Sequence, residues 1–168
     1  DEASQTSGSM ARLAAEGHRV VCVYATNGDH GEPAPDLGDD TVAAYRRREA
    51  AASNEVIGTA RVAWLGYADS GMTGWNANEN PDSFHLADLA EAATRLAAVL
   101  DEEDADAVVG YDWHGGYGHP DHVKLHHVVR RACEVARRRP RYLEETANRD
   151  AMERLFAQAI ASGASRIW

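Results

Sequence analysis

Apolar and polar positions alternate along this chain with the periods of helices and short strands. The clearest helical stripe occupies residues 86–100, where apolar side chains recur at positions 86, 89, 93, 96, 97 and 100. A second helix is expected to begin after the cap Asp40-Thr41 and to end at Gly58. In all, the pattern predicts helices at residues 8–16, 41–57, 86–100, 120–138 and 149–161.

Three short runs rich in β-branched residues lie between these helices and predict strands. They cover residues 19–26, 61–65 and 107–111. The resulting order, α-β-α-β-α-β-α-α, predicts an α/β fold of the Rossmann-like, doubly wound type, with a mostly parallel sheet and helices on both faces. Such a domain normally begins with a strand, so we expect the first strand to be missing upstream of Asp1.

Length and charge limit the classes of protein that fit. The 168 residues suffice for one core, and we expect residues 1–168 to form a single domain truncated at its N-terminus. The apolar end at Ile167-Trp168 suggests a second truncation. A net charge of −10 argues against nucleic acid or an anionic membrane as a partner. Without a signal peptide or an 18-residue apolar run, a cytoplasmic protein is expected. The sequence leaves a homo-oligomer open.

Polar and small residues gather in the three loops that follow the predicted strands, at residues 27–32, 66–74 and 112–122. In open α/β sheets, ligands bind beyond the carboxyl ends of the strands, so we expect these loops to meet at one edge. The third loop is the most informative. Its three glycines let the backbone approach a ligand closely, and Pro120 suits the first turn of a helix.

His119, Asp121 and His122 therefore cluster at the N-terminus of a predicted helix, and the two histidines can face one site because they are three positions apart. An Asp beside a His can orient the imidazole and raise its basicity, which serves a metal ligand or a general acid. The alternative is that Pro120-Asp121 only starts a helix and that the histidines lie on the surface. Two histidines, an aspartate and three glycines at one strand-to-helix turn favour a site.

Other signatures are weaker. His122 and His126 have the spacing of a zincin helix, but Val123 stands where that motif needs Glu. We expect His126 and His127 to be solvated or packed helix residues. The glycines of the third loop do not make a dinucleotide fingerprint, which belongs after a first strand. The two distant cysteines form neither a disulfide framework nor a metal pair, and Cys22 is expected to be a buried free thiol.

The third loop also carries a resemblance to a known family. The run Gly115-Gly116-Tyr117-Gly118-His119-Pro120-Asp121-His122 resembles the C-terminal metal motif of the LmbE-like (PIG-L) N-acetylglucosaminyl deacetylases. That family's other motif is a His-Pro-Asp-Asp-Glu run at the end of its first strand, and Asp1-Glu2-Ala3-Ser4 looks like this motif cut after its third residue. Residues 11–18, 27–32 and 65–72 also resemble the family, so the likeness extends to about residue 150.

The resemblance implies a zinc-dependent deacetylase that acts on a small N-acetylated sugar. Asp1 and His122 match two of the three zinc ligands, and the third ligand and the general base would lie upstream. Another divalent transition metal would suit the same ligands. His119 matches the residue that stabilises the oxyanion or protonates the leaving amine. Asp121 matches its orienting carboxylate, and Tyr117 a mobile tyrosine that helps to polarise the carbonyl.

The resemblance further implies that the sugar hydroxyls are held by Arg46, Asp69 and Glu32. Because two zinc ligands at most lie in this chain, we expect the chain alone to bind zinc weakly and to turn over little. Two rival hypotheses stay open. The first is a non-catalytic or truncated sugar-binding relative of the same fold, and the second is a Rossmann-like nucleotide binder. An interaction domain has no positive support in the sequence.

Overall fold

The structure, a computed structural model, describes residues 5–32, 37–38, 40–146 and 148–163. In chain order the elements are α2 (Ser7–Ala15), β1 (Val21–Thr26), α3 (Val42–Ile57), β2 (Arg61–Tyr67), the 3₁₀ turns η1 (Asn76–Glu79) and η2 (Phe84–Leu86), α4 (Leu89–Glu102), β3 (Ala107–Tyr111), α5 (Gly115–Gly118), α6 (Pro120–Val135), β4 (Arg141–Glu145) and α7 (Arg149–Ala161). Every helix and strand expected from the sequence is therefore present, with ends that shift by a few residues.

The strands form two parallel pairs. β1 pairs with β2 from Val21 opposite Arg61, and β3 pairs with β4 from Ala107 opposite Arg141. In the doubly wound strand order 3-2-1-4-5-6, strands 2 and 3 lie side by side on one side of strand 1, and strands 4 and 5 lie on its other side. The residues that the structure describes contain no strand that joins the two pairs.

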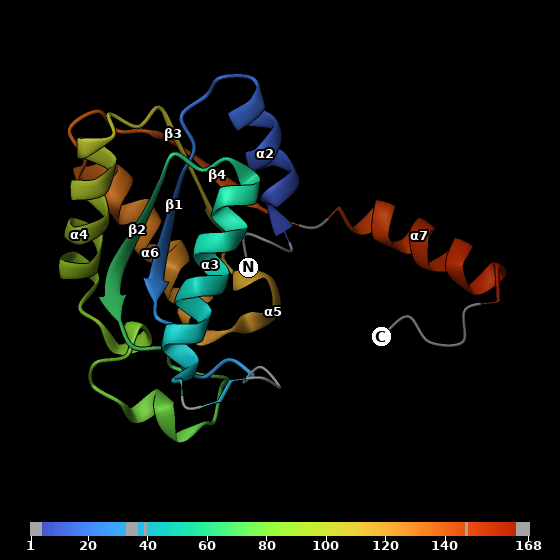
Figure 1. Cartoon of the computed structure of the whole chain (residues 1–168), viewed down its shortest axis with the longest axis horizontal. Coiled ribbons are helices and arrows are strands. Elements are labelled where there is room, and N and C mark those ends of the chain that lie inside the picture. The colour runs from blue at the N-terminus through green and yellow to red at the C-terminus, as the bar shows by residue number, and fades with distance from the viewer. Residues whose placement is uncertain (1–4, 33–36, 39, 147, 164–168) are drawn as a thin grey trace.

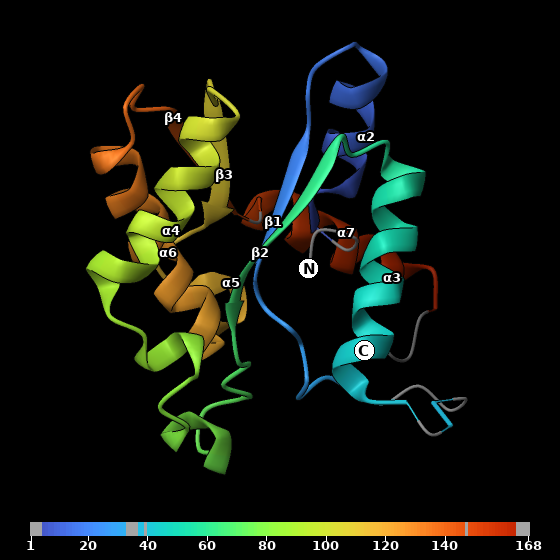
Figure 2. The ribbon, with the colours of Figure 1, turned by 60° about the vertical axis from the view of Figure 1, so that its left-hand side comes forward.

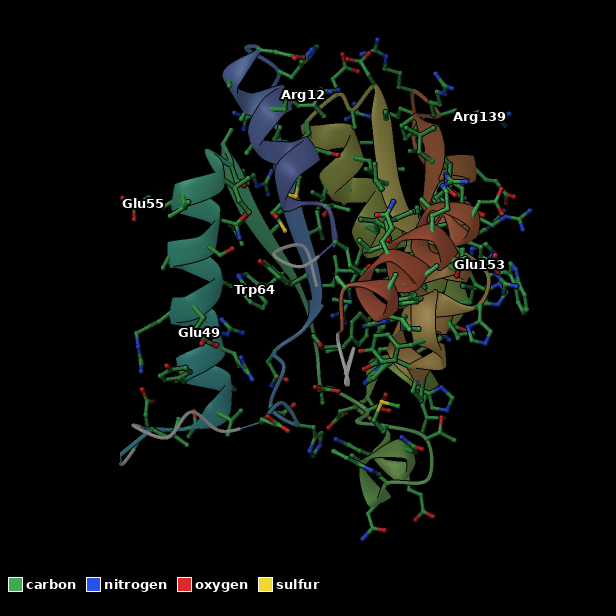
Figure 3. All side chains as sticks on the ribbon, turned by 90° about the vertical axis from the view of Figure 1, so that its right-hand side faces the viewer. Arg12, Glu49, Glu55, Trp64, Arg139 and Glu153 are labelled. Carbon is green, nitrogen blue, oxygen red and sulfur yellow. The ribbon has the colours of Figure 1, made fainter. Side chains whose placement is uncertain are left out.

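Helices cover both faces of the β1–β2 pair, as the sequence predicts for a doubly wound α/β fold. α4 and α6 lie on one side, and α2 and α3 lie on the other (Figures 1 and 2). Trp64 points from β2 toward α3 (Figure 3), where its ring stacks on Tyr24 at 4.5 Å and lies under the Arg47 guanidinium at 4.9 Å. The main core lies on the opposite face, where α4 and α6 pack against each other and on the strands.

The apolar stripe of α4 is buried only in part. Leu96 and Leu100 are buried in the core, as predicted, but Leu86 is 50% exposed and Leu89 is 40% exposed. The reason is that the helix begins at Leu89, after the Asp88 carboxylate caps the Glu91 N–H at 2.8 Å. The preceding 3₁₀ turn buries Phe84 completely instead.

The strand β4 was not expected, because the sequence pattern predicted no strand between the helices at residues 120–138 and 149–161. β4 pairs with β3 over its full length, although three of its five residues are charged. Its period-2 signal is weak because none of its five residues is buried in the structure. Helix α6 also ends at Val135, three residues earlier than predicted.

The remaining features agree with the composition. Cys22 is buried and Cys133 is partly buried, and neither forms a disulfide. Helix α7 projects away from the rest of the molecule (Figure 1), and all of its residues are at least partly exposed. Among the described residues, no helix is long and apolar enough to cross a membrane.

Candidate active site

The three loops predicted to meet at one edge are tied together by hydrogen bonds from backbone N–H groups to carboxylates. The N–H of Asp69 donates to Asp29 Oδ1 at 3.2 Å, which joins the loop after β1 to the loop after β2. The N–H of Ser70 donates to Asp121 Oδ2 at 3.0 Å, which joins the loop after β2 to the first turn of α6. The expectation that these loops form one region is confirmed.

His119 caps the N-terminus of α6. Its Nδ1 accepts a hydrogen bond from the Asp121 N–H at 3.2 Å, and Pro120 occupies the first turn, where a missing N–H costs nothing. Because Nδ1 accepts, the proton of the neutral ring is on Nε2. That nitrogen lies 4.0 Å from Asp69 Oδ1.

His122 lies one turn further, with its ring centroid 4.8 Å from that of His119. Its Nδ1 donates to the Gly115 carbonyl at 3.2 Å, and its ring stacks on Tyr111 at 4.1 Å with planes 7° apart. Metal-binding histidines commonly have one ring nitrogen held in this way by a backbone carbonyl, which fixes the tautomer and the ring orientation.

The loop that supplies this carbonyl is organised by Asp112. The Asp112 Oδ1 accepts hydrogen bonds from the N–H groups of His114 at 3.0 Å and Gly116 at 3.1 Å. These bonds lower the pKa of the Asp112 carboxyl, and the bond from the Gly116 N–H contributes most. Gly115 must be glycine, since its φ is 67° and a Cβ would lie 2.7 Å from His122 Cβ and from the Val123 backbone nitrogen.

Burial dominates the electrostatics of the site. Desolvation, together with the charge of the other histidine, lowers the pKa of His119, and desolvation also lowers the pKa of His122. Desolvation raises the pKa of Asp121. Desolvation also raises the pKa of the Tyr117 hydroxyl, and the negative charge of Asp69 raises it further. Both imidazoles are therefore neutral near pH 7, the state in which a ring nitrogen can bind a metal or donate a hydrogen bond.

The donor atoms fit a divalent transition metal. Asp69, His119 and Asp121 each offer a ligand atom, and these atoms lie within 4.8 Å of one another. Mixed carboxylate and imidazole donors suit zinc and its neighbours better than calcium or magnesium, which prefer oxygen alone. His122 is next to this group. Asp1, the other zinc ligand implied by the family resemblance, lies outside the described residues.

The residues predicted to hold a sugar are joined through the loop after β1. Arg46 of α3 donates from Nη2 to the Glu32 carbonyl at 2.8 Å, and its Nη1 pairs with Glu49 at 2.7 Å. Asp69 contacts the same loop through Asp29. Tyr117 is 56% exposed, and its ring centroid lies 5.0 Å from that of His122 in an edge-to-face arrangement. The loop after β1 thus contacts both Arg46 and Asp69.

Sequence reasoning missed four residues that hold this site, namely Asp29, Ser70, Tyr111 and Asp112. Each lies in or beside a loop that the sequence singled out, but each acts through a backbone group or a ring face. Such contacts join residues as far as 51 positions apart, as in the Ser70–Asp121 bond, and leave no local pattern. His126, expected to be either solvated or packed, is a packed residue of the helix, because it is 3% exposed and its Nδ1 lies 3.2 Å from the Tyr111 carbonyl.

A cavity of about 560 Å³ lies elsewhere, along the free side of β2. Trp64, Tyr67, Glu91 and Arg95 are among the residues that line it. Asp69, His119, Asp121 and His122 all lie outside its lining, so the titratable cluster at the strand ends is the better candidate for chemistry.

Metal-dependent hydrolases use sites of this kind, in which neutral histidines and buried carboxylates lie at the strand ends of an open α/β domain. Residues 1–133 match the family profile described as PIG-L, GlcNAc-PI de-N-acetylase, and the chain belongs to this family.

Three known proteins illustrate the likeness. The 1D-myo-inositol 2-acetamido-2-deoxy-alpha-D-glucopyranoside deacetylase of Streptomyces scabiei (strain 87.22) is 42% identical over 148 residues, which cover 81% of this chain and 46% of that protein. The N,N'-diacetylchitobiose deacetylase from Pyrococcus horikoshii superposes with a TM-score of 0.64 at 24% identity, covering 80% of this chain and 45% of the other. The zinc-inhibited form of teicoplanin deacetylase Orf2 superposes with a TM-score of 0.59 at 23% identity, covering 80% and 59%.

The two structural likenesses show the shared fold. The chain spans about half the length of the curated relatives that it matches.

Proposed function

We propose that this protein is a zinc-dependent N-deacetylase, which hydrolyses the acetamide of an N-acetylglucosamine-type sugar conjugate. The observation that carries the proposal is the convergence of His119, His122 and Asp121 with Asp69 at the strand ends of a chain that belongs to the PIG-L family. A cytoplasmic location, expected from the sequence, belongs to the same proposal.

The metal is assigned to His122 together with Asp1. The structure supports the first of these ligands, because the Gly115 carbonyl fixes the His122 ring through Nδ1. A bound zinc ion would supply a hydroxide near neutral pH and polarise the acetyl carbonyl. Another divalent transition metal would serve the same purpose.

His119 is proposed to stabilise the developing oxyanion. Of the two roles implied by the resemblance, hydrogen-bond donation fits better, since Nδ1 already accepts from the Asp121 N–H and Nε2 carries the proton. Burial lowers the pKa of His119, and the charge of the Asp121 carboxylate offsets part of this effect, so it favours any positive charge that develops on that ring. Tyr117 lies at the rim of the site, beside both histidines, where its hydroxyl would meet the acetyl carbonyl of the substrate.

The substrate is proposed to be a glucosaminyl conjugate bound through its hydroxyl groups by Arg46, Asp69 and Glu32. The Streptomyces scabiei relative is named for an acetamido sugar linked to inositol, which supports a sugar of this class. The held guanidinium of Arg46 and the anchored carboxylate of Asp69 are suited to such hydroxyls because their positions are fixed before binding.

The test is amine release from a simple N-acetylglucosaminide by the product of the complete gene, stripped of metal with a chelator and then given back zinc. We expect release that depends on zinc and that is abolished in His122→Ala. His127→Ala, at an exposed position of the same helix, is the matched control and should retain activity. Zinc binding without release on any acetamido sugar would contradict the proposal. If the protein neither binds zinc nor releases amine, a non-catalytic relative is the better account.

A further inference from the structure

Trp75 lies in the long loop that follows β2, next to the residues assigned to the sugar. Its indole ring lies against the backbone of Gly71, where a Cβ would come 2.6 Å from Cε3 of that ring. The Gly71 N–H in turn donates to Asp69 Oδ1 at 2.8 Å. The ring of His30, from the loop after β1, meets the indole edge-to-face, with centroids 6.3 Å apart. Trp75 is therefore next to both loops that carry the proposed sugar-binding residues.

The segment that carries this indole is fixed by hydrogen bonds. The Trp75 N–H donates to the Met72 carbonyl at 3.1 Å. The Asn78 side-chain amide donates to the Ser70 carbonyl at 2.7 Å, and its oxygen accepts from the Gly74 N–H at 2.9 Å. The position of the indole ring is thus set before any ligand binds, so a ligand that uses it has little ordering cost.

Despite these anchors, much of the indole surface faces water. Trp75 is 50% exposed, and Met72 of the same loop is 37% exposed. Trp64 shows the contrast, because its ring stacks on Tyr24 and lies under the Arg47 guanidinium. Folding gains little from a tryptophan that keeps half of its surface in water, and an anchored, exposed aromatic ring is typical of a binding surface.

We propose that Trp75 is a stacking platform for the aglycone, the group joined to the N-acetylglucosaminyl unit, and this inference rests on the proposed function. Asp69 lies between the proposed oxyanion donor and the loop of Trp75, because its Oδ1 is 4.0 Å from His119 Nε2 and 2.8 Å from the Gly71 nitrogen. A sugar held at Asp69 with its acetamide at His119 directs its far end toward the indole.

The chemistry of an indole face defines the aglycone that fits it. The face of an aromatic ring is negative, and it attracts the C–H groups on the flat side of a saturated ring. A second pyranose or another polyhydroxylated ring has such a side and keeps its hydroxyl groups in water at the rim. Trp75 therefore selects conjugates with a ring-shaped aglycone over the monosaccharide alone.

The test compares two probes that differ by one ring, the methyl glycoside of N-acetylglucosamine and N,N'-diacetylchitobiose. Their Kd values are measured by calorimetry on the complete protein without metal, so that turnover does not interfere. We expect the disaccharide to bind about 3–10-fold more tightly, the range that one aromatic stacking contact explains. Trp75→Leu should abolish this preference, since leucine keeps an apolar contact but has no aromatic face, whereas Trp75→Phe should retain part of it.

Trp113→Ala is the matched control, because Trp113 is 70% exposed but lies in the loop after β3. This variant should keep the preference for the disaccharide. An equal preference in Trp75→Leu and Trp75→Phe would overturn the platform, and so would equal binding of the two probes, or of neither, by the unaltered protein. None of these results decides the deacetylase proposal, which is tested by amine release. Zinc binding without release would contradict that proposal whatever the result for Trp75.

Discussion

The ring of Tyr111 lies parallel to the ring of His122, with centroids 4.1 Å apart and planes 7° apart. The last residue of β3 thereby supports a histidine in the first turn of α6. The Tyr111 carbonyl is held in turn from two sides, by the Tyr142 hydroxyl at 2.7 Å and by His126 Nδ1 at 3.2 Å. The unexpected strand β4 thus reaches the site through Tyr142.

Removing this hydroxyl should weaken the fold modestly. Tyr142→Phe loses the hydrogen bond to the Tyr111 carbonyl, and we expect the free energy of unfolding in urea to fall by about 1 kcal/mol. The loss is limited because His126 still contacts the same carbonyl. Tyr117→Phe is the control, since that side chain is 56% exposed, and its effect should stay within about 0.5 kcal/mol. Equal effects of the two variants would contradict this account.

Replacing His119 should separate metal binding from catalysis. In the complete protein, His119→Ala at one equivalent of zinc should keep the metal and lower kcat by about 10²–10³-fold, the usual cost of losing one oxyanion donor. The zinc content is measured by elemental analysis and the rate by amine release. Unchanged turnover would end the assignment of this residue. His127→Ala, exposed on the same helix, should leave both quantities unchanged.

Gly115 and Gly118 provide a matched test of close packing. Both have positive φ, 67° and 84°, so alanine at either position costs about 1–2 kcal/mol of stability. At Gly115 a Cβ would also collide with His122 and Val123, which adds about 1–3 kcal/mol, whereas at Gly118 the nearest atom is 3.6 Å away. Urea unfolding should therefore rank Gly115→Ala as clearly less stable than Gly118→Ala. The reverse order would exclude the packing argument.

The buried histidines should make stability depend on pH in a stated direction. The folded-state pKa values of His119 and His122 are lowered by burial, so the unfolded chain binds protons that the folded chain does not. The stabilisation is complete above the unfolded pKa of about 6.5 and is lost as pH falls through the folded pKa values.

The measurement is urea unfolding of the chain with a chelator between pH 8 and pH 5. We expect stability to fall toward pH 5 and the slope to be smaller in His122→Gln. Asp121 acts in the opposite sense at lower pH, because burial raises its pKa and its folded form binds a proton more readily above pH 3.8. A stability that rises from pH 8 to pH 5 would contradict the histidine assignment.

Much of the fold is local in origin and could be read from the chain. The Thr41 cap, the left-handed Gly58 and the stripe at Leu96 and Leu100 mark their helices because each signal lies within the element that it defines. The third loop was identified as the site for the same reason, since His119, Asp121 and His122 lie within four positions of one another.

What the sequence by itself determined was therefore the order of helices and strands and the residue types at the strand ends. Only the tertiary structure decided that β4 pairs with β3, that Ser70 anchors Asp121, and that Tyr111 supports His122. These relationships depend on backbone N–H groups, carbonyls and ring faces, which every sequence contains and no local pattern marks. These groups find their partners only in the folded protein, because folding brings together loops that lie far apart along the chain.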